Sequence, residues 1–176
     1  MIEHVTGIPK ERILILDFGS QYTQLIARRI RELNVYAEII PYHHPVEDII
    51  REKPSAIILS GGPASFYEKG SPKISDEIFK LGVPVLGICY GLYVVVNAYK
   101  GESGGAASRE YGRAIINIKG KSELLKGLGK KEQVWMSHGD KVLKIPEGFS
   151  VTASSENAEI AAIENPSKKV YGVQFH

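Results

Sequence analysis

An apolar run that ends at a cysteine set between two glycines constrains the fold of this chain most. The run covers residues 83–88 and includes Gly87; Cys89 follows it, and Gly91 lies two residues further on. This pattern is typical of a nucleophile elbow, a tight turn from strand to helix whose flanking positions leave no room for a side chain. Because such a turn pushes its middle side chain out over the end of the sheet, we expect the Cys89 thiol to be presented, not buried.

The same turn gives Cys89 a chemical reason to react. At the start of the next helix the thiol meets unpaired backbone N–H groups and the positive end of the helix dipole, and both favour the thiolate. We therefore expect a nucleophile that is partly ionised near neutral pH. The alternative is a small core residue, since free cysteines are among the most buried residue types. This stretch alone leaves both interpretations open.

The composition bounds the class of protein. The 176 residues suit a single domain, and a formal net charge of +2 gives no field that would attract nucleic acid or an anionic membrane surface. A single cysteine cannot form an internal disulfide, and no apolar run has the length of a signal sequence or a membrane span. We expect a cytoplasmic protein with no nucleic-acid or membrane partner. The histidines lack ligand-like spacing, so we expect no metal site.

Apolar strand-like segments and helical segments alternate through the first half of the chain. The predicted strands cover residues 12–18, 36–40, 56–60 and 83–88, and the predicted helices cover residues 20–33, 46–52 and 74–81. This alternation predicts an α/β fold with an open, mostly parallel, flavodoxin-like sheet and helices on both faces. We expect Ser20 to cap the first helix, and Leu25, Ile26, Ile30 and Leu33 to form one apolar face of it.

Beyond Arg113 the pattern changes to strand-like segments separated by turns. They cover residues 114–118, 133–136, 142–145, 150–154, 160–163 and 170–175. The second half is therefore predicted to be β-rich and partly antiparallel. No linker separates the two halves, so we expect one domain over residues 12–176, preceded by a mobile extension over residues 1–11.

In an open α/β sheet, functional groups gather at the carboxyl ends of the strands. The strand at residues 56–60 leads into Gly61 and Gly62, where the lack of a Cβ lets backbone N–H groups approach a ligand. Together with the N–H of Tyr90, these groups could form an oxyanion hole. A phosphate cradle or a plain Gly-Gly-Pro turn are the alternatives.

A thiol nucleophile also needs a base within hydrogen-bond reach. Two of the five histidines, His138 and His176, follow strand-like segments. Either could reach Cys89, and position in the sequence does not choose between them. His43 and His44 flank the end of the second strand and are predicted to be loop residues.

Motifs spread in order along the chain resemble those of class I, triad-type glutamine amidotransferases. They are DFGSQY at residues 17–22, LSGGP at 59–63, GICYG at 87–91, REYGR at 109–113, SHGD at 137–140 and GVQFH at 172–176. The resemblance runs from about Arg12 to His176. Within this family the motifs are most similar to those of the glutaminase domains of GMP synthetases.

The resemblance implies that the chain hydrolyses glutamine to glutamate and ammonia. Cys89 would attack the side-chain amide and form a γ-glutamyl thioester, while the N–H groups of Gly62 and Tyr90 stabilise the oxyanion. His176 would protonate the departing ammonia and then activate water. The residues that the resemblance places around the substrate are Gly61, Tyr93, Ser137 and His138.

In this family the ammonia passes to a synthetase partner, an ATP pyrophosphatase domain or subunit that aminates XMP to GMP. The Ser60–Pro63 loop lacks the Ser-Gly-Gly-x-Asp-Ser pattern with which that module binds ATP. We therefore expect no cofactor in this domain, and ATP and Mg only in the synthetase module. The polar loops at residues 110–113 and 138–140 are candidates for its docking surface.

The sequence departs from the family pattern at three places. Tyr93 stands where the family usually has a substrate-holding glutamine, so we expect weaker substrate binding. Residues 92–108 have poor helix propensity and could form an altered segment, a shortened helix or a mobile loop. The family's orienting glutamate follows the last histidine, so we expect a domain truncated at its C-terminal end and weakly active or inactive as written.

Two other classes stay open from the sequence. A DJ-1-like cysteine hydrolase or redox-sensitive protein has a similar elbow, and its cysteine would react with electrophiles whether or not glutamine is present. A noncatalytic docking module would fold with an inert Cys89. Glutamine-dependent protection of Cys89 distinguishes these classes from an amidotransferase.

Overall fold

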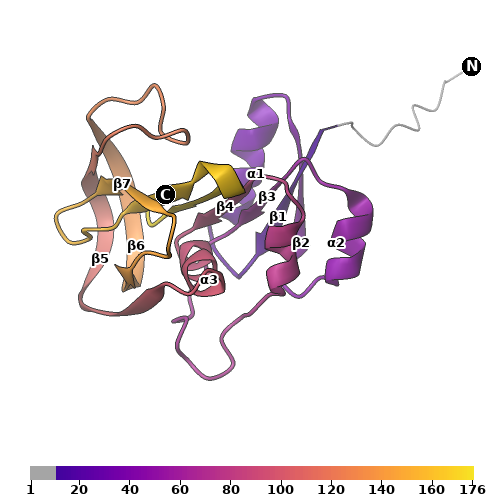
Figure 1. Cartoon of the computed structure of the whole chain (residues 1–176), viewed down its shortest axis with the longest axis horizontal. Coiled ribbons are helices and arrows are strands. Elements are labelled where there is room, and N and C mark those ends of the chain that lie inside the picture. The colour runs from indigo at the N-terminus through magenta and orange to yellow at the C-terminus, as the bar shows by residue number, and fades with distance from the viewer. Residues whose placement is uncertain (1–10) are drawn as a thin grey trace, which may run out of the picture.

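The computed structural model of the protein describes residues 11–176, with only the backbone at residues 107 and 108 (Figure 1). The predicted extension at residues 1–11 lies outside the described residues except for Glu11. The strands are β1 (Arg12–Asp17), β2 (Tyr36–Pro41), β3 (Ala56–Leu59), β4 (Val85–Ile88), β5 (Glu102–Ile118), β6 (Lys131–Lys144), β7 (Ser150–Ser154), β8 (Ala162–Asn165) and β9 (Val170–Val173). The helices are α1 (Thr23–Glu32), α2 (Val46–Glu52) and α3 (Tyr90–Ala98), with short 3₁₀ turns η1 (Asp76–Lys80) and η2 (Pro166–Lys168).

One sheet of nine strands runs through the described chain in the order β2-β1-β3-β4-β9-β8-β7-β5-β6. The strands from β2 to β9 in this order pair in parallel, and the pairs from β9 to β6 are antiparallel. This arrangement confirms the predicted α/β fold with a β-rich second half. The parallel half presents its carboxyl ends, including the end of β4 at Ile88, along one edge.

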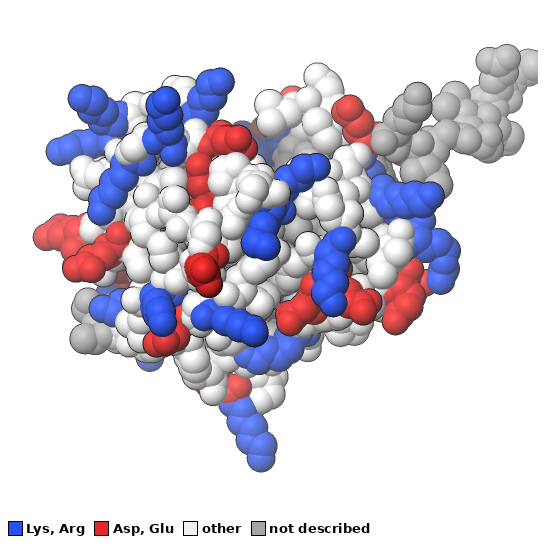
Figure 2. All heavy atoms as spheres, in the orientation of Figure 1, with Lys and Arg blue, Asp and Glu red and all other residues white. Residues whose placement is uncertain are grey.

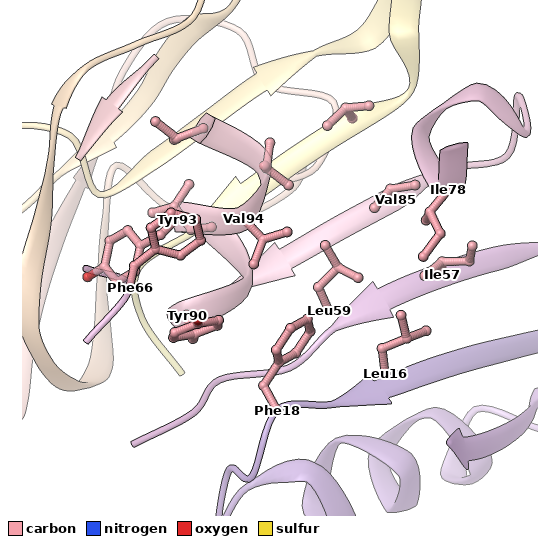
Figure 3. Close-up of a cluster of buried hydrophobic side chains, with 14 of the residues drawn as sticks. Leu16, Phe18, Ile57, Leu59, Phe66, Ile78, Val85, Tyr90, Tyr93 and Val94 are labelled. Atoms are coloured by element: carbon pink, nitrogen blue, oxygen red, sulfur yellow. The ribbon is translucent and has the colours of Figure 1, made fainter. Parts of the chain in front are cut away.

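Side chains of β1 alternate between the two faces of the sheet. Leu14 and Leu16 join the larger core cluster, which also contains residues of α2, η1 and α3, and Figure 3 shows part of it. Ile15 faces the other way and packs with Ala27 of α1. A third cluster, around Met136, packs against one face of the antiparallel strands. Helices therefore cover both faces of the parallel strands, as predicted.

The start of α1 differs from the prediction. Its N-cap is Tyr22, while the Ser20 hydroxyl accepts a hydrogen bond from the Tyr22 N–H at 3.0 Å in the turn before the helix. Thr23 is the first helical residue and is buried, with its hydroxyl donating to the Asp17 carboxylate at 2.8 Å. This bond fixes which side of α1 faces the sheet.

The apolar face of α1 is accordingly narrower than predicted. Leu25 and Leu33 are 46% and 75% exposed, so their assignment to a buried face is wrong. Ile26 and Ile30 pack against the sheet as expected, together with the small residue Ala27. A small residue at the centre of the contact lets the helix lie close to the strands.

The poorly helical tract after Cys89 forms a short buried helix followed by a long strand. Residues 90–96 of α3 are all buried, so tertiary packing of its β-branched side chains outweighs their low helix propensity. The strand β5 then begins at Glu102 and ends at Ile118, so it includes the predicted 114–118 segment and starts well before it. The predicted strands at 133–136 and 142–145 are likewise parts of one strand, β6, and the predicted helix at 74–81 is the 3₁₀ turn η1.

Charges of both signs are distributed over the face shown in Figure 2, and basic side chains gather over the connection between β5 and β6. That connection contains Lys119, Lys121, Lys126 and Lys130, all of which are exposed. Among residues 11–176, none of the helices has the length and apolar character needed to cross a membrane.

Substitution of Gly91 tests the close packing of the elbow against β3. A Cβ at this position would overlap the carbonyl oxygen of Leu59. We expect Gly91→Ala to lower the free energy of unfolding by at least about 2 kcal/mol, although alanine normally stabilises a helix relative to glycine. Chemical denaturation followed by circular dichroism measures the difference.

Gly105→Ala is the matched control, because a Cβ there meets no atom within 4 Å. We expect this variant to stay within about 0.5 kcal/mol of the parent chain. Equal unfolding free energies for the two variants would contradict the packing argument.

Candidate active site

The turn between β4 and α3 has the conformation expected of a nucleophile elbow. Cys89 lies at φ 55° and ψ −104°, a backbone conformation that residues other than glycine rarely adopt. The Cys89 N–H donates to the carbonyl of Val173 at 2.8 Å, and the Gly91 N–H donates to that of Ser60 at 3.1 Å. A Cβ on Gly87 would overlap the Gly91 carbonyl oxygen, so the flanking glycines are required. The strands on both sides of β4 therefore hold the turn.

Cys89 lines a cavity of about 440 Å³. The residue is only 4% exposed, so the predicted presented thiol is wrong for this structure. The sulfur is covered by β6, and its S–H donates to the Ser137 carbonyl at 3.4 Å.

The ionisation of Cys89 also differs from the prediction. Burial raises the pKa of the thiol to about 11, against smaller opposing effects of the Tyr90 N–H and the Gln174 side chain. The negative charge of Asp140 raises the pKa further. The cost of desolvating the anion is thus larger than the stabilisation available at the start of this short helix. The resting nucleophile is a thiol.

His176 is the histidine that the structure brings to Cys89. A Cβ built on Gly61 would lie 3.3 Å from His176 Cε1 and 3.5 Å from Cys89 Cβ, so both side chains approach one point. The backbone of His176 exchanges two hydrogen bonds of 2.8 Å with Trp135 of β6, and its ring packs on that of Tyr22 at 4.3 Å between centroids. These contacts fix the ring beside the elbow.

Burial lowers the pKa of His176, and the nearby His138 lowers it further. The imidazole is therefore neutral near pH 7 and able to accept a proton. A protonated thiol and a neutral imidazole together form the resting pair at this site.

His138 occupies a different position at the same cavity. Its Nε2 lies 3.0 Å from a carboxylate oxygen of Glu110, and its Nδ1 lies 2.8 Å from the carbonyl oxygen of Asp140. Both ring nitrogens thus face oxygens within the protein. This leaves neither nitrogen for Cys89, and of the two predicted bases only His176 is in place.

The bend at Gly61 and Gly62, which follows β3, contributes Gly62 to the cavity wall. A Cβ on Gly62 would lie 2.7 Å from the carbonyl oxygen of Phe18, so this position requires glycine. The Ser60 hydroxyl accepts from the Phe18 N–H at 3.0 Å and ties the bend to the end of β1. Gly62 and Tyr90 line the same cavity as Cys89, as an oxyanion hole requires.

The residues predicted to bind substrate also gather here. Tyr93, Ser137 and His138 line the cavity. Gly61 does not line it, but a Cβ built there would contact both the Cys89 and the His176 side chains. The predicted site residues come from the loop after β3, the turn before α3, α3 itself, β6 and the C-terminal end of the described chain, and the fold brings them together.

Sequence reasoning missed Gln174, Asp140 and Glu110 as individual site residues, although each lies within a quoted motif. Gln174 is fully buried, and its Oε1 lies 2.8 Å from the Tyr93 hydroxyl. The Asp140 carboxylate accepts from the Ser65 hydroxyl at 2.8 Å and from the Phe66 N–H at 3.0 Å, which ties the loop after β3 to the cavity. Their motif positions were the only signal available before the structure.

The chain matches known proteins over almost its whole length. The model of the class-I glutamine amidotransferase family matches residues 14–176. A glutamine-hydrolysing GMP synthase of Brachyspira hyodysenteriae is 54% identical over 166 residues, which are 94% of this chain and 32% of that protein. One of Caldanaerobacter subterraneus is 55% identical over 170 residues, 97% of this chain and 33% of that protein. The chain spans about one third of the length of these relatives.

Solved structures show the same fold. The crystal structure of a candidate GMP synthase component from Thermoplasma acidophilum is similar to this chain, with a TM-score of 0.85 and 25% identity. The match covers 94% of this chain and 83% of the other. A glutamine amidotransferase from Thermotoga maritima has a TM-score of 0.74 at 20% identity, over 94% of this chain and 75% of the other.

The environment of His176 predicts a direction for the pH dependence of stability. Because its pKa is lower in the folded than in the unfolded protein, the folded state binds fewer protons. The neutral His176 ring makes its full contribution to the free energy of unfolding above about pH 6.5. This contribution is lost as the pH falls through the folded-state pKa. We expect the stability advantage of the parent chain over His176→Gln to be smaller at pH 5 than at pH 7.5.

Denaturant unfolding of both proteins at the two pH values measures this advantage, and NMR titration of the His176 ring gives the pKa directly. An advantage that grows on acidification, or a ring pKa above 6.5, would show that the charged imidazole is favoured instead.

Proposed function

Because the chain belongs to the class-I glutamine amidotransferase family, we propose that it hydrolyses glutamine to glutamate and ammonia with Cys89 as the nucleophile. One observation supports this most: Cys89 and His176 line the same cavity, and a Cβ built on Gly61 would lie within 3.5 Å of both side chains. A neutral imidazole next to a protonated thiol is the arrangement that general-base activation of a cysteine needs.

In the first half of the proposed reaction, His176 accepts the S–H proton as the sulfur attacks the carbon of the glutamine side-chain amide. The amide oxygen becomes an oxyanion, which the N–H groups of Gly62 and Tyr90 stabilise. His176 then donates its proton to the nitrogen, the C–N bond breaks, and ammonia leaves. The product is a γ-glutamyl thioester on Cys89.

In the second half, His176 takes a proton from water as the water oxygen attacks the thioester carbonyl. The C–S bond breaks, glutamate leaves, and the sulfur recovers its proton from His176. The protein returns to a thiol and a neutral imidazole, so every proton transfer of the cycle is assigned to a residue of this domain. The raised pKa of Cys89 means that the proton moves when substrate is bound, not before.

The cavity carries groups suited to the other end of glutamine. Arg109 and Glu68 both line it, and free glutamine has one carboxylate and one ammonium group. We assign Arg109 to the carboxylate and Glu68 to the ammonium. Tyr93, Ser137 and His138, which also line the cavity, are assigned to the side-chain amide region.

We further propose that the ammonia serves a synthetase partner, an ATP pyrophosphatase domain or subunit that aminates XMP to GMP. The identity to glutamine-hydrolysing GMP synthases and the one-third share of their length support this. The segments 110–113 and 138–140, predicted to be docking loops, lie within strands β5 and β6, so the prediction of loops is wrong. Glu110, His138 and Asp140 are also buried, which argues against direct contact with a partner. Tyr111 is 65% exposed and also lines the cavity, so we assign it to the partner surface.

A glutamine-mimicking diazoketone tests the proposed chemistry. We expect intact-mass analysis to show one adduct, on Cys89, because the reagent places its electrophilic carbon where the glutamine amide carbon binds. Excess glutamine should prevent labelling, and Cys89→Ser should abolish it.

Asparagine is the control ligand, since its amide carbon lies one methylene short of the sulfur, and it should not protect. Labelling that glutamine does not block would favour a reactive-cysteine hydrolase. A folded chain that the reagent does not label would favour a noncatalytic module.

A further inference from the structure

The turn between β1 and α1 carries the DFGSQY motif, and the proposed reaction assigns no role to it. Residues 19–22 of this turn line the same cavity as Cys89 and His176. A segment in this place can contact either the substrate or the catalytic pair. The contacts of Tyr22, the last residue of the motif, favour the second role.

Three hydrogen bonds hold the turn. One oxygen of the Asp17 carboxylate accepts from the Gly19 N–H at 2.9 Å and from the Thr23 hydroxyl at 2.8 Å. The Ser20 hydroxyl accepts from the Tyr22 N–H at 3.0 Å. Tyr22 is thereby fixed at the N-cap of α1, and its side chain extends to the C-terminal segment.

The ring of Tyr22 packs on the imidazole of His176. The ring centroids lie 4.3 Å apart, and the ring planes make an angle of 38°. Gly61 leaves room for the imidazole, since a Cβ there would lie 3.3 Å from His176 Cε1. His138 is held differently, because both of its ring nitrogens lie within hydrogen-bond distance of an oxygen. The orientation of the His176 ring thus depends on its packing against Tyr22.

This orientation matters because a general base has to point one nitrogen at the proton that it accepts. The two backbone hydrogen bonds between His176 and Trp135 fix where the His176 side chain starts. They leave two side-chain torsions, and the rotamers differ in where the ring nitrogens point. Any rotamer that turns the imidazole away loses the aromatic contact with Tyr22, so that contact favours the observed one.

The same contact shields the imidazole from water. His176 is half-buried, and burial is the main cause that lowers the pKa of its ring. Tyr22 contributes to this burial because its ring lies on the imidazole. Removal of the Tyr22 ring therefore exposes the imidazole and favours its charged form.

We propose that Tyr22 is a positioning residue for His176, and that the hydrogen-bonded turn at residues 17–23 holds its ring against the imidazole. This deepens the proposed function and rests on it only in taking His176 as the base. The DFGSQY motif then serves the proton transfers, not the binding of substrate.

Other titratable groups share the cavity with His176 and come from the loop after β3, the elbow, α3, β5 and β6. They are Glu68, Cys89, Tyr93, Arg109, His138 and Asp140. Of these, the nearby His138 also lowers the pKa of His176. A change at position 22 removes none of these side chains, so its effect on His176 reports on the contact with Tyr22.

NMR titration of the His176 ring tests the proposal without glutamine. The ring signal is identified by its absence in His176→Gln. In Tyr22→Ala we expect the pKa of His176 to rise toward its ordinary value, because the exposed imidazole is hydrated. Tyr22→Phe keeps the ring and should keep the pKa of the parent chain.

Tyr36→Ala is the matched control. Tyr36 is 43% exposed and pairs with Arg12 at the start of β1, at the opposite end of the strands from the cavity. Its removal should leave the pKa of His176 unchanged. An unchanged pKa in Tyr22→Ala, or an equal rise in Tyr22→Phe, would overturn the proposal.

Thr23→Val tests the turn without removing a group from the cavity, since Thr23 does not line it. The substitution deletes the hydroxyl that bonds to Asp17. We expect the pKa of His176 to rise less than in Tyr22→Ala, and this rise to vanish in a Tyr22→Ala background. An equal rise in both backgrounds would contradict the proposal that the turn acts through Tyr22.

The rate of diazoketone labelling separates positioning from substrate binding, because the S–H proton has to pass to the imidazole. In Tyr22→Ala we expect the rate at saturating reagent to fall about tenfold and the half-saturating concentration to change less than about twofold. A raised half-saturating concentration with an unchanged maximal rate would assign Tyr22 to substrate binding and overturn the proposal. A parent chain that is not labelled would count against the proposed function alone, because the NMR titration does not depend on labelling.

Discussion

The left-handed backbone of Cys89 is the constraint on which the site depends. Cys89 can hold this conformation because Gly87 and Gly91 approach each other and Leu59 too closely for any side chain, and because the Cys89 N–H bonds to Val173. The bond to Val173 links the elbow to β9, whose chain continues to His176. The nucleophile and its base are thus positioned by neighbouring strands of one sheet, although they lie far apart in the sequence.

Burial decides the resting state of this pair. The helix start and the Tyr90 N–H favour a thiolate, yet desolvation is larger and raises the pKa of Cys89 to about 11. The same burial lowers the pKa of His176. Since each group is held neutral, no buried ion pair has to be maintained before the reaction, and charge develops only where the amide groups of Gly62 and Tyr90 can meet it.

The sequence predicted the features that depend on local pattern, namely the alternating elements of the parallel half and the glycine-flanked elbow. Strand pattern alone did not choose between His138 and His176, because that choice depends on β6 pairing with both β5 and the C-terminal segment; the family resemblance selected His176. The sequence placed Leu25 and Leu33 on the apolar face of α1, but both are exposed. Periodicity shows that a helix has an apolar side but not how the helix is rotated about its axis relative to the sheet, which the bond from Thr23 to Asp17 fixes. The sequence also predicted an exposed thiol because the covering strand, with Ser137, lies 48 residues away along the chain.

Asp140 connects the loop after β3 with His138 and Tyr93. Its carboxylate holds the loop after β3 through Ser65 and Phe66, and its backbone carbonyl meets both His138 and Tyr93. The Tyr93 hydroxyl also lies 2.8 Å from Gln174 Oε1. The loop after β3, His138, Tyr93 and Gln174 therefore share one hydrogen-bonded network through Asp140. For this reason a substitution at position 93 changes a buried hydrogen-bonded network as well as a side chain that lines the cavity.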